Sequence, residues 1–150
     1  MVDLNIGAHI PESYIKGLSQ RIDVYKKIAA IQNKDDAFDV TDELIDRFGE
    51  TPPGVNALIH VALLRGEAGR AGITDISQKQ GTLRFTLSDF DMEKVSALYA
   101  RDEYKNRLRV EAGSKPCLSL KIKNKNRVID EARSFAADWA ACGQTAEQST

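Results

Sequence analysis

The most distinctive chemical feature of the sequence is an acidic stretch, residues 35–50. It holds seven carboxylates against a single base, Arg47. Carboxylates at close spacing suggest calcium binding, but the stretch lacks the glycine and the ligand spacing of an EF-hand loop. Two interpretations remain open: a solvated face of a helix, or a surface that receives a basic partner.

Within this stretch, Glu43 and Asp46 form the sharper candidate site. They are three residues apart, so on a helix both carboxylates project from neighbouring positions of one face. Leu44, Ile45 and Phe48 would then occupy the other side and face the core. A paired acidic edge suits a partner that carries arginines, because a guanidinium group holds a carboxylate through two parallel hydrogen bonds.

A basic stretch, residues 101–127, balances the acidic one. Nine bases outnumber three acids there. Lys121, Lys123 and Lys125 alternate along an expected strand and its exit, so they share a face. Such a row can contact nucleic-acid phosphates, but aromatic residues interleave poorly, and lysines also protect edge strands from mispairing. Edge-strand or solvated lysines are the favoured interpretation, and nucleic-acid binding through Arg107–Arg127 is the alternative function.

The remaining reactive side chains form no recognisable catalytic or cofactor-binding pattern. His9 and His60 are the only histidines, and no cysteine lies at ligand spacing from them, so no metal site is predicted. Cys117 and Cys142 have apolar neighbours and are interpreted as reduced core cysteines. The sequence contains no Gly-rich phosphate loop and no GxSxG nucleophile motif. We therefore predict a domain that is not an enzyme and has no cofactor.

The composition is that of one globular domain. The chain has 150 residues, of which 42% are hydrophobic and 29% charged, and its net charge is -1. No apolar run approaches the ~20 residues of a membrane-spanning helix, and the first residues do not form a secretory signal. We predict a single cytoplasmic domain over residues 1–150, with a flexible polar tail at about 143–150.

Hydrophobic periodicity places helices mainly in the first half of the chain and strand hairpins in the second half. This order predicts an α+β fold: a helical N-terminal half packed with a small, mainly antiparallel sheet and closed by a C-terminal helix. The expected strands are 2–6, 73–80, 82–88, 108–110 and 118–122. The expected helices begin near residues 19, 35, 52, 91 and 126.

The ends and faces of the first two helices follow from residue types. Ser19 and Asp35 are expected to cap them, and Gly49 is expected to end the second. Ile22 and Tyr25 fall at helical spacing and are expected on the apolar side of the first helix.

The third helix contains two interior glycines, Gly66 and Gly69. Interior glycine destabilises a helix by about 1 kcal/mol relative to alanine. We therefore expect a weak or kinked end there, closed by Gly72.

Four segments stand in order in the first half of the chain: Leu4–Ile6 with Ile10–Ile15, Arg21 with Tyr25–Ala29, Glu43–Gly49 with Pro52, and Ala62–Ile73. In this order they resemble the C-terminal domain of bacterial transcription-repair coupling factors. Glu43–Gly49, with the sequence ELIDRFG, is the most specific of the four. The resemblance extends over about residues 2–76, and the rest agrees in length and element order.

The resemblance implies a function. The family's full-length protein is a DNA translocase that dislodges stalled RNA polymerase and recruits the repair protein UvrA. Its motor motifs and polymerase-binding module are absent from these residues, which implies a terminal domain of a longer protein or a separately expressed one. In the family, this domain docks on an N-terminal module that resembles UvrB and masks its UvrA-binding surface. We expect Glu43 and Asp46 to meet arginines of that module.

Overall fold

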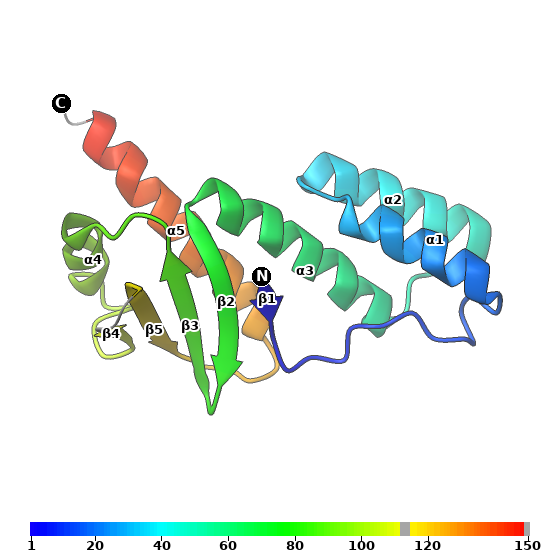
Figure 1. The fold of residues 1–150 in the computed structure, drawn as a ribbon, viewed down its shortest axis with the longest axis horizontal. Coiled ribbons are helices and arrows are strands. Elements are labelled where there is room, and N and C mark those ends of the chain that lie inside the picture. Colours follow the sequence, from blue (N-terminus) through cyan, green and yellow to red (C-terminus); the bar gives the residue numbers. More distant parts are fainter. Residues whose placement is uncertain (112–114, 149–150) are drawn as a thin grey trace. The chain divides into compact units, whose positions relative to one another are not determined.

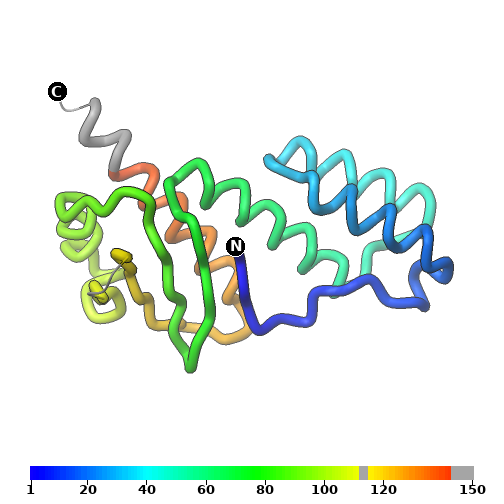
Figure 2. Tube along the Cα trace, viewed as in Figure 1, coloured from blue at the N-terminus to red at the C-terminus, as the bar shows by residue number. Residues whose placement is uncertain are grey.

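The structure, a computed structural model, describes residues 1–111 and 115–148, with side chains through Cys142 (Figures 1 and 2). Contacts divide the chain into two compact units: Asn5–Gly66, and Met1–Leu4 together with Glu67–Thr150. The division falls within helix α3, Pro53–Arg70. Among the described residues, no helix combines the length and the apolar character needed to cross a membrane.

In the unit Asn5–Gly66, helices α1 (Leu18–Ala29) and α2 (Lys34–Phe48) lie side by side. Figure 2 traces them as an antiparallel pair joined by a short turn. They share one apolar core with the first part of α3 and with the loop before α1. The buried side chains of this core are Ile10, Ile15, Val24, Ile28, Ile31, Ala37, Leu44, Val55, Ile59, Ala62 and Leu63.

The rotation of α1 differs from the one predicted. Its N-cap is Gly17 rather than Ser19, and no side chain caps it. Val24 is buried, whereas Ile22 and Tyr25 are 45% and 38% exposed. A helix turns about 100° per residue, so the loop and helices that cover Val24 leave the side bearing Ile22 in solvent.

Helix α2 begins two residues earlier than predicted and ends where predicted. The Oδ1 atom of Asn33 accepts a hydrogen bond from the Asp36 N–H at 2.8 Å, so Asn33 and not Asp35 is the N-cap. Asp35 lies in the first turn, where the positive end of the helix dipole favours a carboxylate. Gly49 ends the helix with φ 92°, a conformation that glycine adopts at little cost.

Helix α3 continues through both interior glycines to Arg70, and Gly72, the residue expected to close it, follows with φ 79°. A Cβ atom on Gly66 would lie 2.3 Å from the Gln32 carbonyl oxygen. Glycine is therefore required at this position by a close approach of two backbone segments. A Cβ atom on Gly69 would meet no atom within 4 Å.

The other unit contains a five-stranded sheet in the order β1-β2-β3-β5-β4. Its strands are β1 (Val2–Asp3), β2 (Ile73–Lys79), β3 (Thr82–Leu87), β4 (Leu108–Glu111) and β5 (Cys117–Lys121). Neighbouring strands are antiparallel except for β1 and β2, which are parallel. The helices and the mainly antiparallel sheet confirm the predicted α+β fold, although β1 is shorter than expected.

Helix α5 (Val128–Gln148) covers one face of this sheet (Figure 1). The Phe135 ring stacks on the ring of Phe85 in β3, with 4.1 Å between their centroids. An ion pair of 2.7 Å between Arg133 and Glu67 joins α5 to the last turns of α3. The buried side chains of α5 are Val128, Ala132, Phe135, Ala136 and Trp139.

A short helix, α4 (Met92–Tyr99), begins after Asp91, as predicted. The Asp91 carboxylate accepts a hydrogen bond from the Glu93 N–H at 2.9 Å and so caps the helix. The backbone of α5 continues past Gly143, where a flexible tail was expected, and residues 149–150 of that tail lie outside the described residues.

Candidate protein-interaction site

The outward surface of α2 carries a row of aspartates. Ala37 and Leu44 face the core and fix the rotation of the helix. Away from them, four aspartates follow at intervals of four, three and four residues, which aligns them along the helix axis. At 1.5 Å per residue the row spans about 16 Å. This aspartate row consists of Asp35, Asp39, Asp42 and Asp46.

All four carboxylates of the aspartate row are exposed. In the part of the chain that the structure describes, none of them is in an ion pair or a side-chain hydrogen bond, unlike Glu43 nearby. Nor does any group of three or more His, Cys, Asp or Glu side chains in that part form a potential metal site. The row is thus available to the arginine or lysine side chains of another molecule.

Glu43, the first of the two predicted site residues, is oriented differently from Asp46. Its carboxylate accepts hydrogen bonds from the Lys27 Nζ of α1 at 2.9 and 2.7 Å. The hydrogen bond from Lys27, together with the lysine's charge, holds the pKa of Glu43 below its ordinary value. The structure therefore places both residues on one helix but leaves only Asp46 without an internal partner.

Two large apolar side chains lie beside the aspartate row. Phe38 is 68% exposed and Ile45 is 43% exposed. The prediction that Ile45 faces the core is wrong, because the core side is set by Leu44, which is fully buried, and the next residue is turned by about 100°. Sequence reasoning missed Phe38. The signal that finds it is its spacing of seven residues from Ile45, two turns along the same face.

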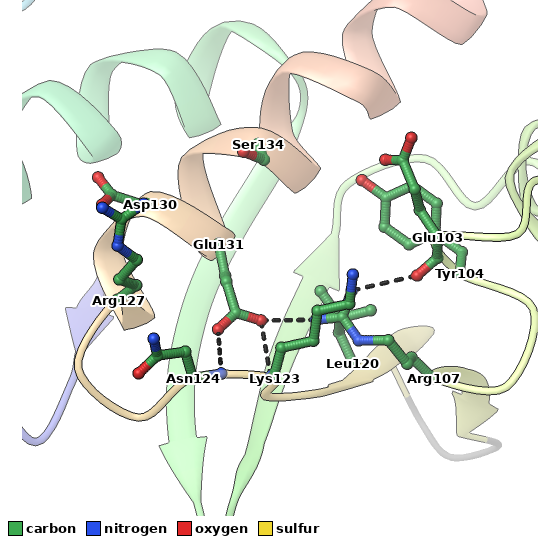
Figure 3. Close-up of a pocket in the computed structure, with 10 residues that line it drawn as sticks. All are labelled: Glu103, Tyr104, Arg107, Leu120, Lys123, Asn124, Arg127, Asp130, Glu131 and Ser134. Atoms are coloured by element: carbon green, nitrogen blue, oxygen red, sulfur yellow. Dashed lines mark hydrogen bonds and ion pairs between the residues drawn. The ribbon is translucent and has the colours of Figure 1, made fainter.

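A pocket of about 290 Å³ lies in the other unit, where the exit of β5 meets the start of α5 (Figure 3). Its central contact is the ion pair between Arg107 and Glu131, at 2.6 Å. The Glu131 carboxylate also accepts hydrogen bonds from the backbone N–H groups of Lys123 and Asn124, each at 2.9 Å. Arg107, the first residue of the basic stretch considered for nucleic-acid binding, is therefore engaged within the domain.

Of the three lysines expected to share a face, only Lys121 lies in a strand. Strand β5 ends at Lys121, and Lys123 and Lys125 lie in the connection to α5. Because β5 lies between β3 and β4, protection of an edge strand does not explain these lysines. Lys121 pairs in register with Thr82 and projects from the sheet face opposite α5, since its neighbour Leu120 is buried beneath that helix.

Three comparisons place this chain among known proteins. A family model described as the TRCF domain matches residues 4–98. The chain is similar to the transcription-repair-coupling factor of Staphylococcus haemolyticus, with 33% identity over 95 residues, and to that of Bacillus subtilis, with 30% identity over 135 residues. These matches cover 63% and 87% of this chain, but only 8% and 11% of the two relatives.

The fold is also found among solved structures. A crystal structure of the C-terminal domain of transcription-repair coupling factor matches with a TM-score of 0.79 and 22% sequence identity, covering 97% of this chain and 94% of that one. The family model spans 95 of the 150 residues and includes all of α2. The chain therefore belongs to the TRCF domain family, the family of the C-terminal domain of transcription-repair coupling factors.

Proposed function

We propose that this domain is a non-catalytic, autoinhibitory domain of a transcription-repair coupling factor. It docks on the UvrB-like N-terminal module of the same polypeptide and masks that module's UvrA-binding surface. Through the whole protein it controls, in the cytoplasm, the recruitment of UvrA to stalled RNA polymerase. Family membership supports this assignment, and the unpaired aspartate row on α2 is the observation that carries it.

An exposed row of carboxylates suits a contact that has to open. An exposed ion pair contributes only about 0.2–1 kcal/mol, and the coupling between two sites of a regulated protein is typically about 1–3 kcal/mol. Within one polypeptide, the tether raises the effective concentration of the docking partner, so weak contacts suffice to keep the domain docked. The separated domain should therefore bind the module only at micromolar or weaker affinity.

The test is a calorimetric titration of this chain with the separately purified UvrB-like module of its parent protein. Asp46→Lys should weaken binding by at least about tenfold, because it places a cation opposite the arginines expected on the module. Asp89→Lys is the matched control, since Asp89 is also exposed but lies in the loop between β3 and α4.

Each result has a definite meaning. Weak binding that Asp46→Lys reduces by at least about tenfold and that Asp89→Lys preserves supports docking through α2. Nanomolar binding would contradict a releasable contact. If the parent chain produced no binding heat at any accessible concentration, the docking function itself would be wrong.

The alternative is a nucleic-acid-binding accessory domain. The pairing register favours it in one respect: Arg84 and Arg109 are both paired with Ser119, so their side chains share the exposed sheet face with Lys121. The Arg84 guanidinium is already hydrogen-bonded to Glu111, however. Only this alternative requires an affinity for DNA that falls steeply with salt.

A further inference from the structure

Phe38 and Ile45 form an unpartnered apolar pair on the solvent side of α2. Their exposures of 68% and 43% contrast with the 7% and 0% of Ala37 and Leu44 on the core side. The helix therefore has a complete buried face without them. Single exposed apolar residues are common on protein surfaces, but an exposed aromatic ring two turns from an exposed isoleucine makes a compact apolar strip.

The apolar pair and the aspartate row are adjacent on the helix surface. Asp35 precedes Phe38 by three residues, and Asp42 follows it by four, so both carboxylates flank the ring. Asp42 also precedes Ile45 by three residues. The result is an apolar centre bordered by negative charge, which is the arrangement of a binding surface with a hydrophobic anchor and a polar rim.

Asp35 in the first turn is favoured by the helix dipole, but the other three aspartates of the row have no stabilising partner among the residues that the structure describes. Aspartates four residues apart on a helix repel each other, and Asp46 lies in the last turn, where the negative end of the helix dipole disfavours a carboxylate. Glu43 shows the contrasting case, because Lys27 neutralises it within the domain. Residues that work against local stability without an internal counterpart point to a function outside the domain.

We propose that Phe38 and Ile45 anchor the docking surface of this domain and that the aspartate row forms its rim. The partner is a protein surface that carries arginines around an apolar recess. A guanidinium group can pair with Asp42 and at the same time lie over the Phe38 ring, while the recess takes up Ile45. Glu43 is a positioning residue that holds α2 against α1. This inference rests on the proposed function and identifies the contacts that perform it.

The experiment measures the affinity of single variants for the purified UvrB-like module. Phe38→Ala should weaken binding about 30-fold, the effect of losing a hot-spot aromatic side chain, and Asp42→Asn should weaken it less. Leu18→Ala is the matched control, because Leu18 is 65% exposed but lies on α1. It should leave the affinity unchanged.

Folding does not confound these variants. Phe38 is exposed and alanine is a better helix former, so Phe38→Ala should unfold at the same temperature as the parent or higher, by circular dichroism. If the unsubstituted chain binds and Phe38→Ala binds equally well, the proposed anchoring role of Phe38 is wrong while the proposed docking function stands. If the unsubstituted chain does not bind, the anchoring role and the docking function are both wrong. If the chain instead self-associates through Phe38, as sedimentation would show, a second copy is the partner and the inference is overturned.

Discussion

The hydroxyl group of Tyr104 ties the segment before β4 to helix α5. Its O–H donates a hydrogen bond to the Asp138 carboxylate, and the Arg101 guanidinium lies 3.5 Å from the same carboxylate. Burial raises the pKa of Tyr104, and the hydrogen bond to Asp138 raises it further. Nothing in the sequence marked Tyr104, because its role depends on a partner 34 residues away.

The Tyr104→Phe variant should lose less stability at alkaline pH than the unsubstituted chain does. An unfolded tyrosine ionises near pH 10, whereas the folded protein keeps Tyr104 protonated above that pH. The stabilising effect is therefore complete below pH 10 and declines as pH rises towards the higher folded pKa, by about 1.4 kcal/mol per pH unit. Urea unfolding at pH 9 and pH 11 should show a smaller pH effect in Tyr104→Phe than in the parent.

Tyr99→Phe is the control for this measurement, since Tyr99 is 48% exposed and should behave as the parent does. An identical pH effect in the parent and in Tyr104→Phe would show that Tyr104 titrates normally in the folded protein.

Helix α3 contains two interior glycines, Gly66 and Gly69, whose surroundings differ. Its apolar spacing predicts the helix, and both glycines oppose it through their low helix propensity. Gly66 is explained by the Gln32 carbonyl oxygen, which leaves no room for a Cβ atom. Gly69 is exposed and has open space around it. At Gly69 only helix propensity applies, and it favours alanine. At Gly66 the close approach of the Gln32 carbonyl oxygen outweighs helix propensity and favours glycine.

The two glycines should respond to alanine with opposite signs. Gly66→Ala should lower the free energy of unfolding by about 1–3 kcal/mol, the usual effect of forcing extra volume into a packed contact. Gly69→Ala should raise it by about 0.5–1 kcal/mol, because alanine is the better helix former. Urea unfolding of the two variants measures both changes. Equal shifts in the same direction would show that helix propensity alone decides at these positions.

The charge of the molecule is nearly balanced in sum but uneven along the chain. Acidic residues are concentrated on α2, in the unit Asn5–Gly66, and the basic stretch belongs to the other unit. Internal contacts engage part of that basic stretch: Arg107 pairs with Glu131, and Arg101 pairs with Glu103. A net charge of -1 provides no overall attraction to DNA.

The chain should therefore show no measurable affinity for a short duplex DNA at about 0.15 M salt, where charges further apart than about 8 Å are largely screened. Fluorescence anisotropy of a labelled duplex measures this directly. Binding that weakened steeply with added salt, and that was lost in an Arg109→Ala, Lys121→Ala double variant, would instead establish the exposed sheet face as a nucleic-acid site.

Local patterns were sufficient to predict the helices, the hairpins and the α+β class. The β2–β3 hairpin around Gly81, the Asp91 cap and the Gly49 helix end all follow from residues close together in the chain. The ELIDRFG segment, together with the order of its neighbours, was sufficient to indicate the family. These features depend on backbone preferences and on spacings between nearby residues, and both can be read directly from the sequence.

The face that each element turns towards the core was decided by the tertiary structure. Ile22 and Ile45 look like core residues in the sequence, yet the packing around Val24 and Leu44 leaves both in solvent. Lys27 engages Glu43, so only Asp46 of the predicted pair remains open. Periodicity determines that a helix has an apolar side. Which of two adjacent apolar positions is buried depends on neighbours that are distant in sequence, because burial depends on the whole packed core.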